Sequence, residues 1–459
     1  MNTLRRSLSL HPLAVSLALV LGASAVHASP LAAVAVVNCL DHGAGSLRQA
    51  IIDNTSSAPI DLTQLACSRI TLTSGSINVQ RAQLIQGPGA ALLEIDGAHL
   101  DRVFTQTSTQ PLALYGMTVQ NGYTDSFGGG CVYTAGALQL KDTVIRNCRV
   151  SDVASASTVK GGGVLVHGAL TAFDSAIIDN ENYSSLGNAF GGGAAVDGVA
   201  VLDHSTISGN VVSNGGNIAA VGGIDVGGVL TMTYSTIAGN RASGLPASPG
   251  SIGGLRAFGG ATITHSTISS NSAGGTTGGL RLYALTAANS IVNSTISGNS
   301  AGGVGGLYAS GNTSIKNSTI AFNVETAHSG GGLRVANSST SLQSTILAAN
   351  VSGGGVEQNI ALGGPGSISG SNNLIGPSPP FVPADTLVDP KLFPLHDNGG
   401  PTKTHALRAG SPALDAGNLD SGDTTDQRGT GFARVIGASA DIGAFEGVDT
   451  DSIFFNGFD

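Results

Sequence analysis

The sequence predicts an all-β protein whose central part is a right-handed parallel β-helix, and three observations carry this prediction. A short motif recurs at nearly constant spacing, a second motif recurs in step with it, and no segment shows a sustained helical period. The composition agrees, because 68 of the 459 residues are Gly, about twice the usual ~7% share. Hydrophobic residues still make up 41%, which distinguishes the chain from a disordered Gly/Ser polymer.

The first motif is Ser-Thr-Ile followed shortly by Asn. The tripeptide occurs at 205–207, 235–237, 266–268, 294–296, 318–320 and 344–346. With looser copies before it, we expect its apolar position to form an inward-facing column: Val144, Ile177, Ile207, Ile237, Ile268, Ile296, Ile320 and Ile346. The Asn residues form a second column: Asn121, Asn147, Asn180, Asn210, Asn240, Asn271, Asn299, Asn323 and Asn350. We expect these Asn residues at turns, where Asn tolerates left-handed backbone angles and its amide can bond along the axis.

The second motif is Gly-Gly followed by a small or apolar residue, and it occurs from 129–130 to 331–332. A short alternating strand follows it. In Leu333-Arg334-Val335, for example, Leu and Val point to one side and Arg to the other. A unit of this size cannot bury its apolar face alone, so the units must stack on one another.

The N-terminal segment resembles a cleaved secretory signal. Arg5 and Arg6 precede an apolar run, 13–22, which is too short to span a bilayer, and Val26-His27-Ala28 supplies small residues at the cleavage site. We therefore expect an exported protein, extracellular or at the cell surface, with no transmembrane segment after cleavage.

Five segments follow from these patterns. They are a signal peptide (1–28), an N-terminal cap with the first coils (29–110), the β-helix repeats (111–376), a C-terminal module rich in Pro, Gly and Asp (377–447) and a short tail (448–459).

The chain contains four Cys in two groups that are local in sequence. In an exported protein such residues are typical of disulfides, so we expect Cys39 to pair with Cys67 and Cys131 with Cys148.

Several segments resemble known bacterial surface proteins. The repeats resemble right-handed β-helix proteins of the pectin-lyase-like fold, including the polymorphic outer-membrane-protein-like group. The stretch 43–51 (GAGSLRQAI) resembles their CSLREA-type opening segment, without the Cys before the serine. The stretches 397–402 (DNGGPT), 410–417 (GSPALDAG) and 441–446 (DIGAFE) are similar to the choice-of-anchor Q module. The resemblance implies an adhesin-like surface protein, and none of these modules carries an established catalytic role.

Charge argues against one class of partner. The formal net charge is −9 and no basic patch is evident, so nucleic acid is not expected. An extracellular glycan or a cell-surface partner is the expected class.

One strip of side chains is the candidate ligand-binding site. Arg256, Arg281, Tyr308 and Arg334 follow the Gly-Gly motif in the same register, after Asp225. We interpret the strip as outward polar positions of a non-catalytic structural or adhesive module. The alternative is a polysaccharide lyase-like enzyme or an acidic-glycan binder, since Arg suits carboxylates. A glycosidase needs two carboxyl groups roughly 5–10 Å apart, and the repeats contain no acidic cluster, so we expect no catalytic residue.

No metal or other cofactor is expected. His204 and His265 match in register with Tyr234 between them, but coils ~4.8 Å apart would place the two His ~10 Å apart, too far to share a zinc ion. We expect them to be exposed. An acidic C-terminal segment leaves Ca²⁺ as an alternative, although acids in such turns usually cap the backbone. Its members are Asp415, Asp420, Asp423, Asp426 and Asp441.

Overall fold

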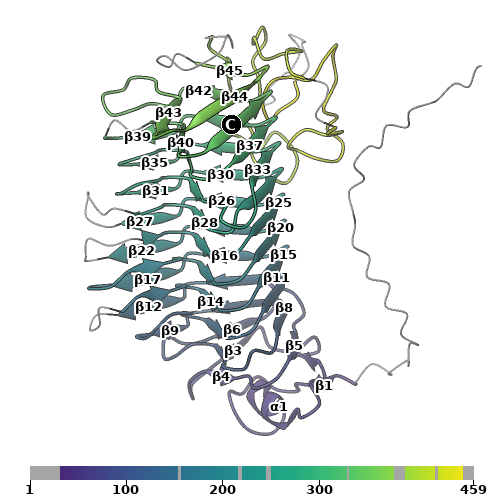
Figure 1. Cartoon of the computed structure of the whole chain (residues 1–459). Helices are drawn as coiled ribbons and strands as arrows, with labels where there is room; N and C mark the ends of the chain where they lie inside the picture. Colours follow the sequence, from purple (N-terminus) through teal and green to yellow (C-terminus); the bar gives the residue numbers. More distant parts are fainter. Residues whose placement is uncertain are drawn as a thin grey trace, which may run out of the picture.

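The computed structural model describes residues 32–152, 157–214, 220–243, 250–327, 330–376, 388–418 and 422–447. These residues form an all-β parallel solenoid, which confirms the predicted fold class (Figure 1). The predicted signal peptide, the C-terminal tail and Asp420 lie outside the described residues.

The stacked coils form four parallel sheets, of which the smallest receives strands from three coils only. The sheet that carries the strip has 11 strands: β4 (Ile77–Asn78), β7 (Phe104–Gln106), β10 (Val132–Thr134), β14 (Val164–Val166), β19 (Ala194–Val196), β24 (Ile224–Val226), β28 (Leu255–Ala257), β32 (Leu280–Leu282), β36 (Leu307–Ala309), β40 (Leu333–Ala336) and β43 (Ile360–Gly363). We call it the eleven-stranded sheet.

A 23-stranded sheet has two parts, joined by the long strands β8 (Leu112–Gln120) and β11 (Leu138–Arg146). Its first coils contain β1 (Val34–Ala35), β2 (Ile60–Asp61), β3 (Arg69–Thr71), β5 (Gln83–Gln86) and β6 (Glu94–Asp96). One later part contains β15 (Leu170–Phe173), β20 (Ala200–Asp203), β25 (Leu230–Thr233), β29 (Ala261–Thr264), β33 (Asn289–Val292), β37 (Thr313–Lys316), β41 (Ser339–Gln343) and β44 (Ser367–Ser371). The other contains β16 (Ala176–Ile178), β21 (Thr206–Ser208), β26 (Thr236–Ala238), β30 (Thr267–Ser269), β34 (Thr295–Ser297), β38 (Thr319–Ala321), β42 (Ile346–Ala348) and β45 (Leu374–Ile375).

Two smaller sheets complete the coils. The first contains β9 (Tyr123–Thr124), β12 (Arg149–Asp152), β17 (Glu181–Ser184), β22 (Val211–Asn214), β27 (Arg241–Ser243), β31 (Ser272–Ala273), β35 (Ser300–Ala301) and β39 (Val324–Glu325). The second contains β13 (Val159–Lys160), β18 (Ala189–Phe190) and β23 (Ala220–Val221).

The predicted apolar column is buried, but its two ends are wrong by one residue. Ile177 through Ile320 align coil to coil and are almost fully buried. At the N-terminal end Ile145, not Val144, pairs with Ile177. At the C-terminal end Leu347, not Ile346, pairs with Ile320. At the C-terminal end the error arises because the last copy of Ser-Thr-Ile, at 344–346, is shifted by one residue against the preceding coil, so that Ile346 pairs with Thr319.

The Asn column forms a buried hydrogen-bonded ladder. The side-chain oxygen of Asn271 accepts from the main-chain N–H (3.0 Å) and the amide nitrogen (2.9 Å) of Asn240. The amide of Asn271 donates in turn to Asn299 Oδ1 (2.9 Å) and to the carbonyl of Ile237 (2.9 Å). The predicted axial bonding is therefore confirmed. The same pattern joins these residues: Asn180, Asn210, Asn240, Asn271, Asn299, Asn323, Asn350 and Asn359.

The expected left-handed geometry belongs to the preceding residue in most coils. Ser270 and Gly298, for example, have φ of 55° and 65°, whereas the Asn residues that follow them are not left-handed. Asn121 and Asn147 do have positive φ (54° each), but they lie one residue before the ladder. Cys148 occupies the ladder position, and its N–H donates to Asn180 Oδ1 (3.0 Å).

The two ends of the solenoid are closed in different ways. At the N-terminal end, helix α1 (Leu47–Asp53), capped by Ser46, buries its apolar face against the first coils (Figure 1). The two disulfides pair as predicted: Cys39 with Cys67 and Cys131 with Cys148. The second disulfide links Cys148, which occupies the ladder position, to Cys131, the residue directly before β10.

The described parts of the C-terminal module, 388–418 and 422–447, lie beside the last coils and do not extend the stack (Figure 1). It packs on the outward face of β30, β34, β38 and β42. Gln427 bonds the hydroxyls of Thr267 (2.9 Å) and Thr295 (2.6 Å), and Ala444 N–H donates to Thr319 (3.1 Å). Apolar contacts join Ile346 and Leu374 to residues such as Phe445. The outward Thr column thus serves as a docking surface within the chain.

Loss of one ladder amide should destabilise the protein. Asn271→Ala leaves the main-chain N–H of Asn240 and one of its two amide hydrogens buried without an acceptor, so we expect the free energy of unfolding to fall by at least ~2 kcal/mol. The control Asn312→Ala, at an exposed site with one 3.3 Å hydrogen bond, should change it by under ~0.5 kcal/mol. Denaturant unfolding measures the free energy of unfolding of the two variants. Equal losses in Asn271→Ala and Asn312→Ala would contradict a stabilising role of the Asn ladder.

The disulfide pairing has its own test. Non-reducing peptide mapping of the purified protein should recover peptides linked by Cys39–Cys67 and Cys131–Cys148. A Cys67–Cys131 link or free thiols would show that the pairing is wrong.

Candidate functional site

The predicted strip is one aligned column on the eleven-stranded sheet. Strand pairing places Asp225, Arg256, Arg281, Tyr308 and Arg334 opposite one another on successive coils. The residues on either side of each point inward and are buried. The period of two therefore positions the five side chains on the outer face, as the sequence predicts.

Arg256 is not available to a ligand. Its guanidinium forms a two-pronged ion pair with Asp225, with Nε–Oδ1 at 2.7 Å and Nη2–Oδ2 at 2.9 Å, and both side chains are buried. The rings of Phe190 and Phe258 lie 4.2 Å and 4.8 Å from its central carbon. Arg256 is an outward polar position, as predicted, but its charge is paired within the chain because the preceding coil supplies Asp225 in the same register.

Arg281, Tyr308 and Arg334 form a different arrangement, which we call the arginine–tyrosine strip. The central carbons of Arg281 and Arg334 lie 4.5 Å and 5.8 Å from the ring centroid of Tyr308, and Arg281 also lies 4.9 Å from the ring of Tyr283. Within the described residues, neither guanidinium has an acidic partner. Cation–π contacts hold the charges in place and leave them unneutralised.

Sequence reasoning missed a second group on the same face. Asp197 accepts from Lys160 Nζ at 2.7 Å and is paired with His167 Nδ1 at 2.5 Å. Burial acts to raise the pKa of Asp197, but the hydrogen bonds and charge interactions with Lys160 and His167 together lower it. The ring of Tyr133 meets His167 edge-on at 5.6 Å.

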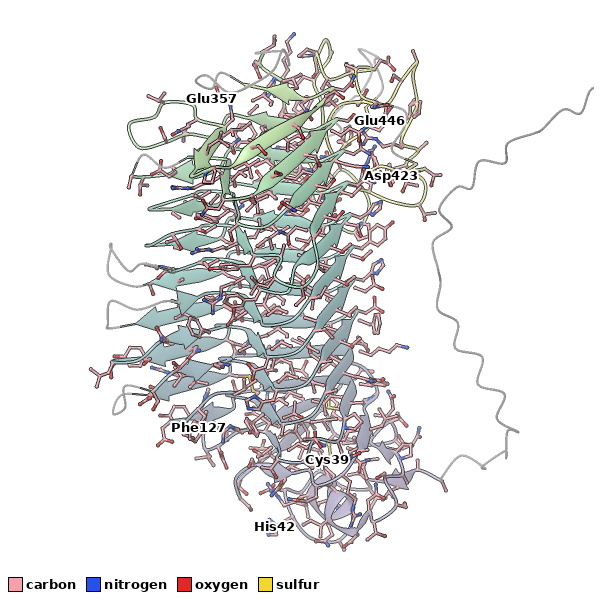
Figure 2. All side chains as sticks on the ribbon, viewed as in Figure 1. Cys39, His42, Phe127, Glu357, Asp423 and Glu446 are labelled. Atoms are coloured by element: carbon pink, nitrogen blue, oxygen red, sulfur yellow. A yellow bond between two sulfur atoms is a disulfide. The ribbon has the colours of Figure 1, made fainter. Side chains whose placement is uncertain are left out.

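Lys160, His167 and Tyr133 of this group line a cavity of about 640 Å³ together with Arg102 and Phe127, the last of which is labelled in Figure 2. A signal for it exists in the sequence. His167 and Asp197 each stand four residues after the second Gly of their Gly-Gly motif, so alignment on that motif places them on adjacent coils. The pairing fixes one imidazole nitrogen on a carboxylate, which is the arrangement that a general base would use.

Within the described part of the C-terminal segment, the acidic residues do not converge on a cation site. The carboxylate of Asp426 is held by Arg428 at 2.6 Å, and that of Asp441 accepts from the main-chain N–H of Asp415 at 2.8 Å. Within the described residues, no group of three or more His, Cys, Asp or Glu is placed to hold a metal ion. The Ca²⁺ alternative therefore receives no support from their geometry.

The expectation of exposed His residues is wrong for His265. His204 is exposed, and Tyr234 stacks between it and His265, with ring centroids 4.9 Å and 4.7 Å apart. His265 is half-buried because the C-terminal module covers it, with Thr402 donating to its carbonyl at 3.0 Å. Burial lowers the pKa of His265.

The core of the C-terminal module contains buried charges. Arg434 is almost fully buried, donates to the carbonyl of Asp441 and lies 3.9 Å from Glu446. Burial raises the pKa of Glu446 to about 7. Its oxygens accept from the main-chain N–H groups of Ile436 (3.0 Å) and Asp441 (2.8 Å), so the carboxyl joins three parts of the module.

No helix of the described residues is both long and apolar enough to cross a membrane.

The raised pKa of Glu446 predicts a pH effect with a defined sign. The folded state favours the neutral acid, so this contribution to stability is complete below about pH 4.5 and is lost as the pH rises through about 7. Between pH 5 and 8 the unfolding free energy of the wild type should fall by more than ~1 kcal/mol relative to Glu446→Gln. Denaturant unfolding of the two chains across this range measures the difference, in which titrating groups that do not interact with Glu446 cancel. A difference that stays constant would contradict the assignment.

Comparison with known proteins returns one solved structure. No protein-family model and no curated protein matches the sequence. The fold is similar to the crystal structure of pectate lyase Pel9A, with a TM-score of 0.47 and 15% sequence identity, over 90% of this chain and 96% of that chain.

Proposed function

We propose that this protein is a non-catalytic, exported β-helix that acts as a structural or adhesive interaction module at or outside the cell surface. The observation that carries the proposal is the state of the acids on the outer face of the eleven-stranded sheet. Asp225 is held by Arg256, and Asp197 by Lys160 and His167. Each carboxylate is neutralised by its neighbours, so neither is free to form the acid pair that glycoside hydrolysis requires.

Two further features support an extracellular location and a surface role. Two disulfides are typical of oxidising compartments outside the cytosol. The resemblance of the C-terminal segment to the choice-of-anchor Q module, and of 43–51 to the CSLREA-type opening, supports attachment to or display at the cell surface. We propose that the C-terminal segment is a choice-of-anchor Q module and that 43–51 belongs to a CSLREA-type opening segment.

A second candidate function is binding of an acidic glycan at the arginine–tyrosine strip. Arg281 and Arg334 flank Tyr308, carry no acidic partner in the described part of the chain, and have Nε atoms that are buried without a hydrogen bond. A carboxylate on a sugar would accept from these forked donors.

Acidic-glycan binding at the strip should depend on salt and on the two arginines. Arg281→Ala and Arg334→Ala should each weaken binding of polygalacturonate by about tenfold, because hydrogen bonds between charged groups contribute ~1.5–3 kcal/mol. Arg241→Ala, which removes an exposed Arg of β27, should leave it unchanged. Affinity electrophoresis at low and high salt measures this, and binding that is insensitive to both substitutions would exclude the strip.

The non-catalytic proposal is tested with the same polymer. A lyase acting on uronates releases unsaturated products that absorb in the ultraviolet, and we expect none. Release that disappears in Arg281→Ala would favour the enzymatic alternative, since Arg281 would bind the carboxylate of the uronate.

A further inference from the structure

Three cavities follow one another along the seam between the β-helix and the C-terminal module. Their volumes are about 690, 470 and 670 Å³. The first and second share Ser270 and Leu395, and the second and third share Phe322, Leu392 and Arg408. Because adjacent cavities share lining residues, they form one groove, which we call the seam groove. It lies on a different sheet from the arginine–tyrosine strip.

The groove runs parallel to the solenoid axis. One turn residue from each of six successive coils lines it: Gly209, Gly239, Ser270, Gly298, Phe322 and Ala349. With coils ~4.8 Å apart, five steps give a length of ~24 Å. The opposite wall consists of module residues between 389 and 408. This shape suits an extended polymer better than a compact ligand.

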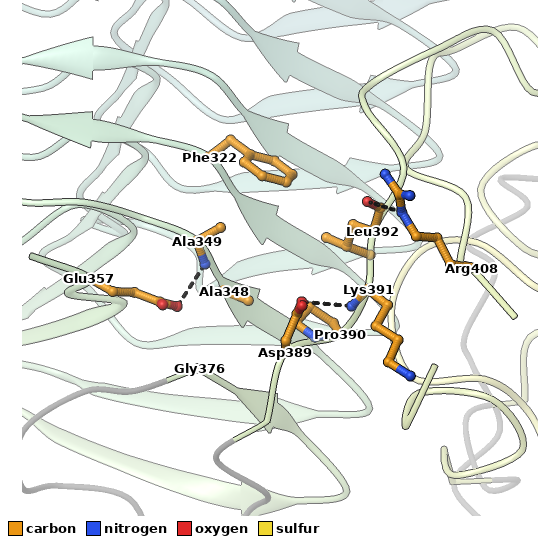
Figure 3. A pocket seen from close by; sticks show the side chains of 10 residues that line it. All are labelled: Phe322, Ala348, Ala349, Glu357, Gly376, Asp389, Pro390, Lys391, Leu392 and Arg408. Atoms are coloured by element: carbon orange, nitrogen blue, oxygen red, sulfur yellow. Dashed lines mark hydrogen bonds between the residues drawn. The ribbon is translucent and has the colours of Figure 1, made fainter. Parts of the chain in front are cut away.

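Phe322 is the exceptional residue of the floor. It has a φ of 58°, a left-handed conformation that bulky residues rarely adopt, where the other five coils have Gly, Ser or Ala. Its side chain is 40% exposed and lies in the wall of the third cavity (Figure 3). The ring of His405 packs against it at 5.1 Å, and His405 is itself held by Ser297 (2.8 Å) and by the carbonyl of Phe393 (2.7 Å). His405 therefore holds the ring of Phe322 in position.

The charges of the groove balance. Its described lining has three cations, Lys391, Lys403 and Arg408, and three acids, Glu357, Asp389 and Asp397. Several are already engaged with the main chain. Lys391 donates to the carbonyl of Gly410 at 2.9 Å. Arg408 donates to the carbonyl of Leu392 at 3.2 Å, and Glu357 accepts from the N–H of Ala349 at 2.8 Å (Figure 3). The groove thus has no net charge with which to select a polyanion or a polycation.

The backbone of the floor excludes an added peptide strand. The N–H groups of Gly239, Ser270 and Gly298 donate to carbonyls of the next coil. Strands cross the groove and do not lie along it, so no open strand edge faces a ligand. A bound peptide would therefore leave its own backbone groups without main-chain partners, whereas sugar hydroxyls can pair with side chains alone.

We infer that the seam groove binds an extended, uncharged glycan chain. One pyranose ring packs its apolar C–H face on Phe322, where dispersion and the negative face of the aromatic ring both favour it. Neighbouring sugar hydroxyls pair with the Thr, Ser and charged side chains that line the rest of the groove. This inference goes beyond the proposed function and does not depend on the arginine–tyrosine strip.

The test uses the full exported chain and a panel of uncharged soluble polysaccharides, namely hydroxyethyl cellulose, galactomannan, arabinoxylan and dextran, in affinity electrophoresis. Phe322→Gly removes the ring and suits the left-handed backbone, so the fold is retained, as thermal unfolding will verify. Phe173→Ala is the matched control, because Phe173 is 41% exposed and lies on β15, outside the groove.

We expect at least one polymer of the panel to bind, equally at low and high salt, with at least a tenfold loss of affinity in Phe322→Gly and no loss in Phe173→Ala. Absence of binding across the panel would overturn the inference, as would binding that Phe322→Gly leaves intact. Binding confined to polygalacturonate, sensitive to salt and lost in Arg281→Ala, would assign recognition to the strip and overturn the groove. A dimer in light scattering that Phe322→Gly dissociates would show instead that a second copy of the chain covers it.

Discussion

The buried Asn ladder is the interaction on which the rest of the structure depends. A parallel stack of short strands has no long hairpins to fix its register, and a slip of one residue would turn every side chain to the other face. Each ladder Asn binds both the main chain and the side chain of its neighbour, so it recognises its position on the next coil in two ways. A buried amide that must satisfy both donors and acceptors tolerates no other alignment. The ladder begins at Cys148, where the disulfide to Cys131 adds a covalent constraint.

Register in turn determines what the surfaces can do. On the eleven-stranded sheet it places an acid under one Arg and an aromatic ring beside two others, so that Arg256 is neutralised while Arg281 and Arg334 keep their charge. On β30 and β34 of the 23-stranded sheet, the same register aligns the outward Thr hydroxyls that form hydrogen bonds with the C-terminal module. The module then creates the wall of the seam groove. The two surfaces that we propose for ligand binding, which differ in charge, thus follow from one repeating unit.

The sequence predicted the periodic features and missed those that break the period. Alignment on Ser-Thr-Ile placed Ile346 in the apolar column, yet Asn350 follows it by four residues, whereas Asn323 follows Ile320 by three. Counting back from Asn would have given Leu347. At the N-terminal end the same count from Asn147 gives Val144 and fails, because Cys148, not Asn147, holds the ladder position and Ile145 lies three residues before it. Ladder position is therefore a better guide to register than the tripeptide, because the Asn makes the specific bonds.

The remaining features could not be read from the repeats. Asp225 and Arg256 share a register, but only the side-chain directions show that they pair. The docking of the C-terminal module joins residues more than 100 positions apart, such as Thr295 and Gln427, and no periodic pattern marks such contacts. For this reason the burial of His265 and the seam groove emerge only from the folded chain.

Hydrogen–deuterium exchange on the wild type and Asn271→Ala tests the central role of the ladder most directly. If the ladder sets the register of whole coils, the variant should exchange faster across both adjacent coils, including β28 and β32 of the eleven-stranded sheet, which do not contact residue 271 through the ladder. Faster exchange confined to the turn around residue 271, with β28 and β32 unchanged, would show that other contacts hold the register and would contradict this account.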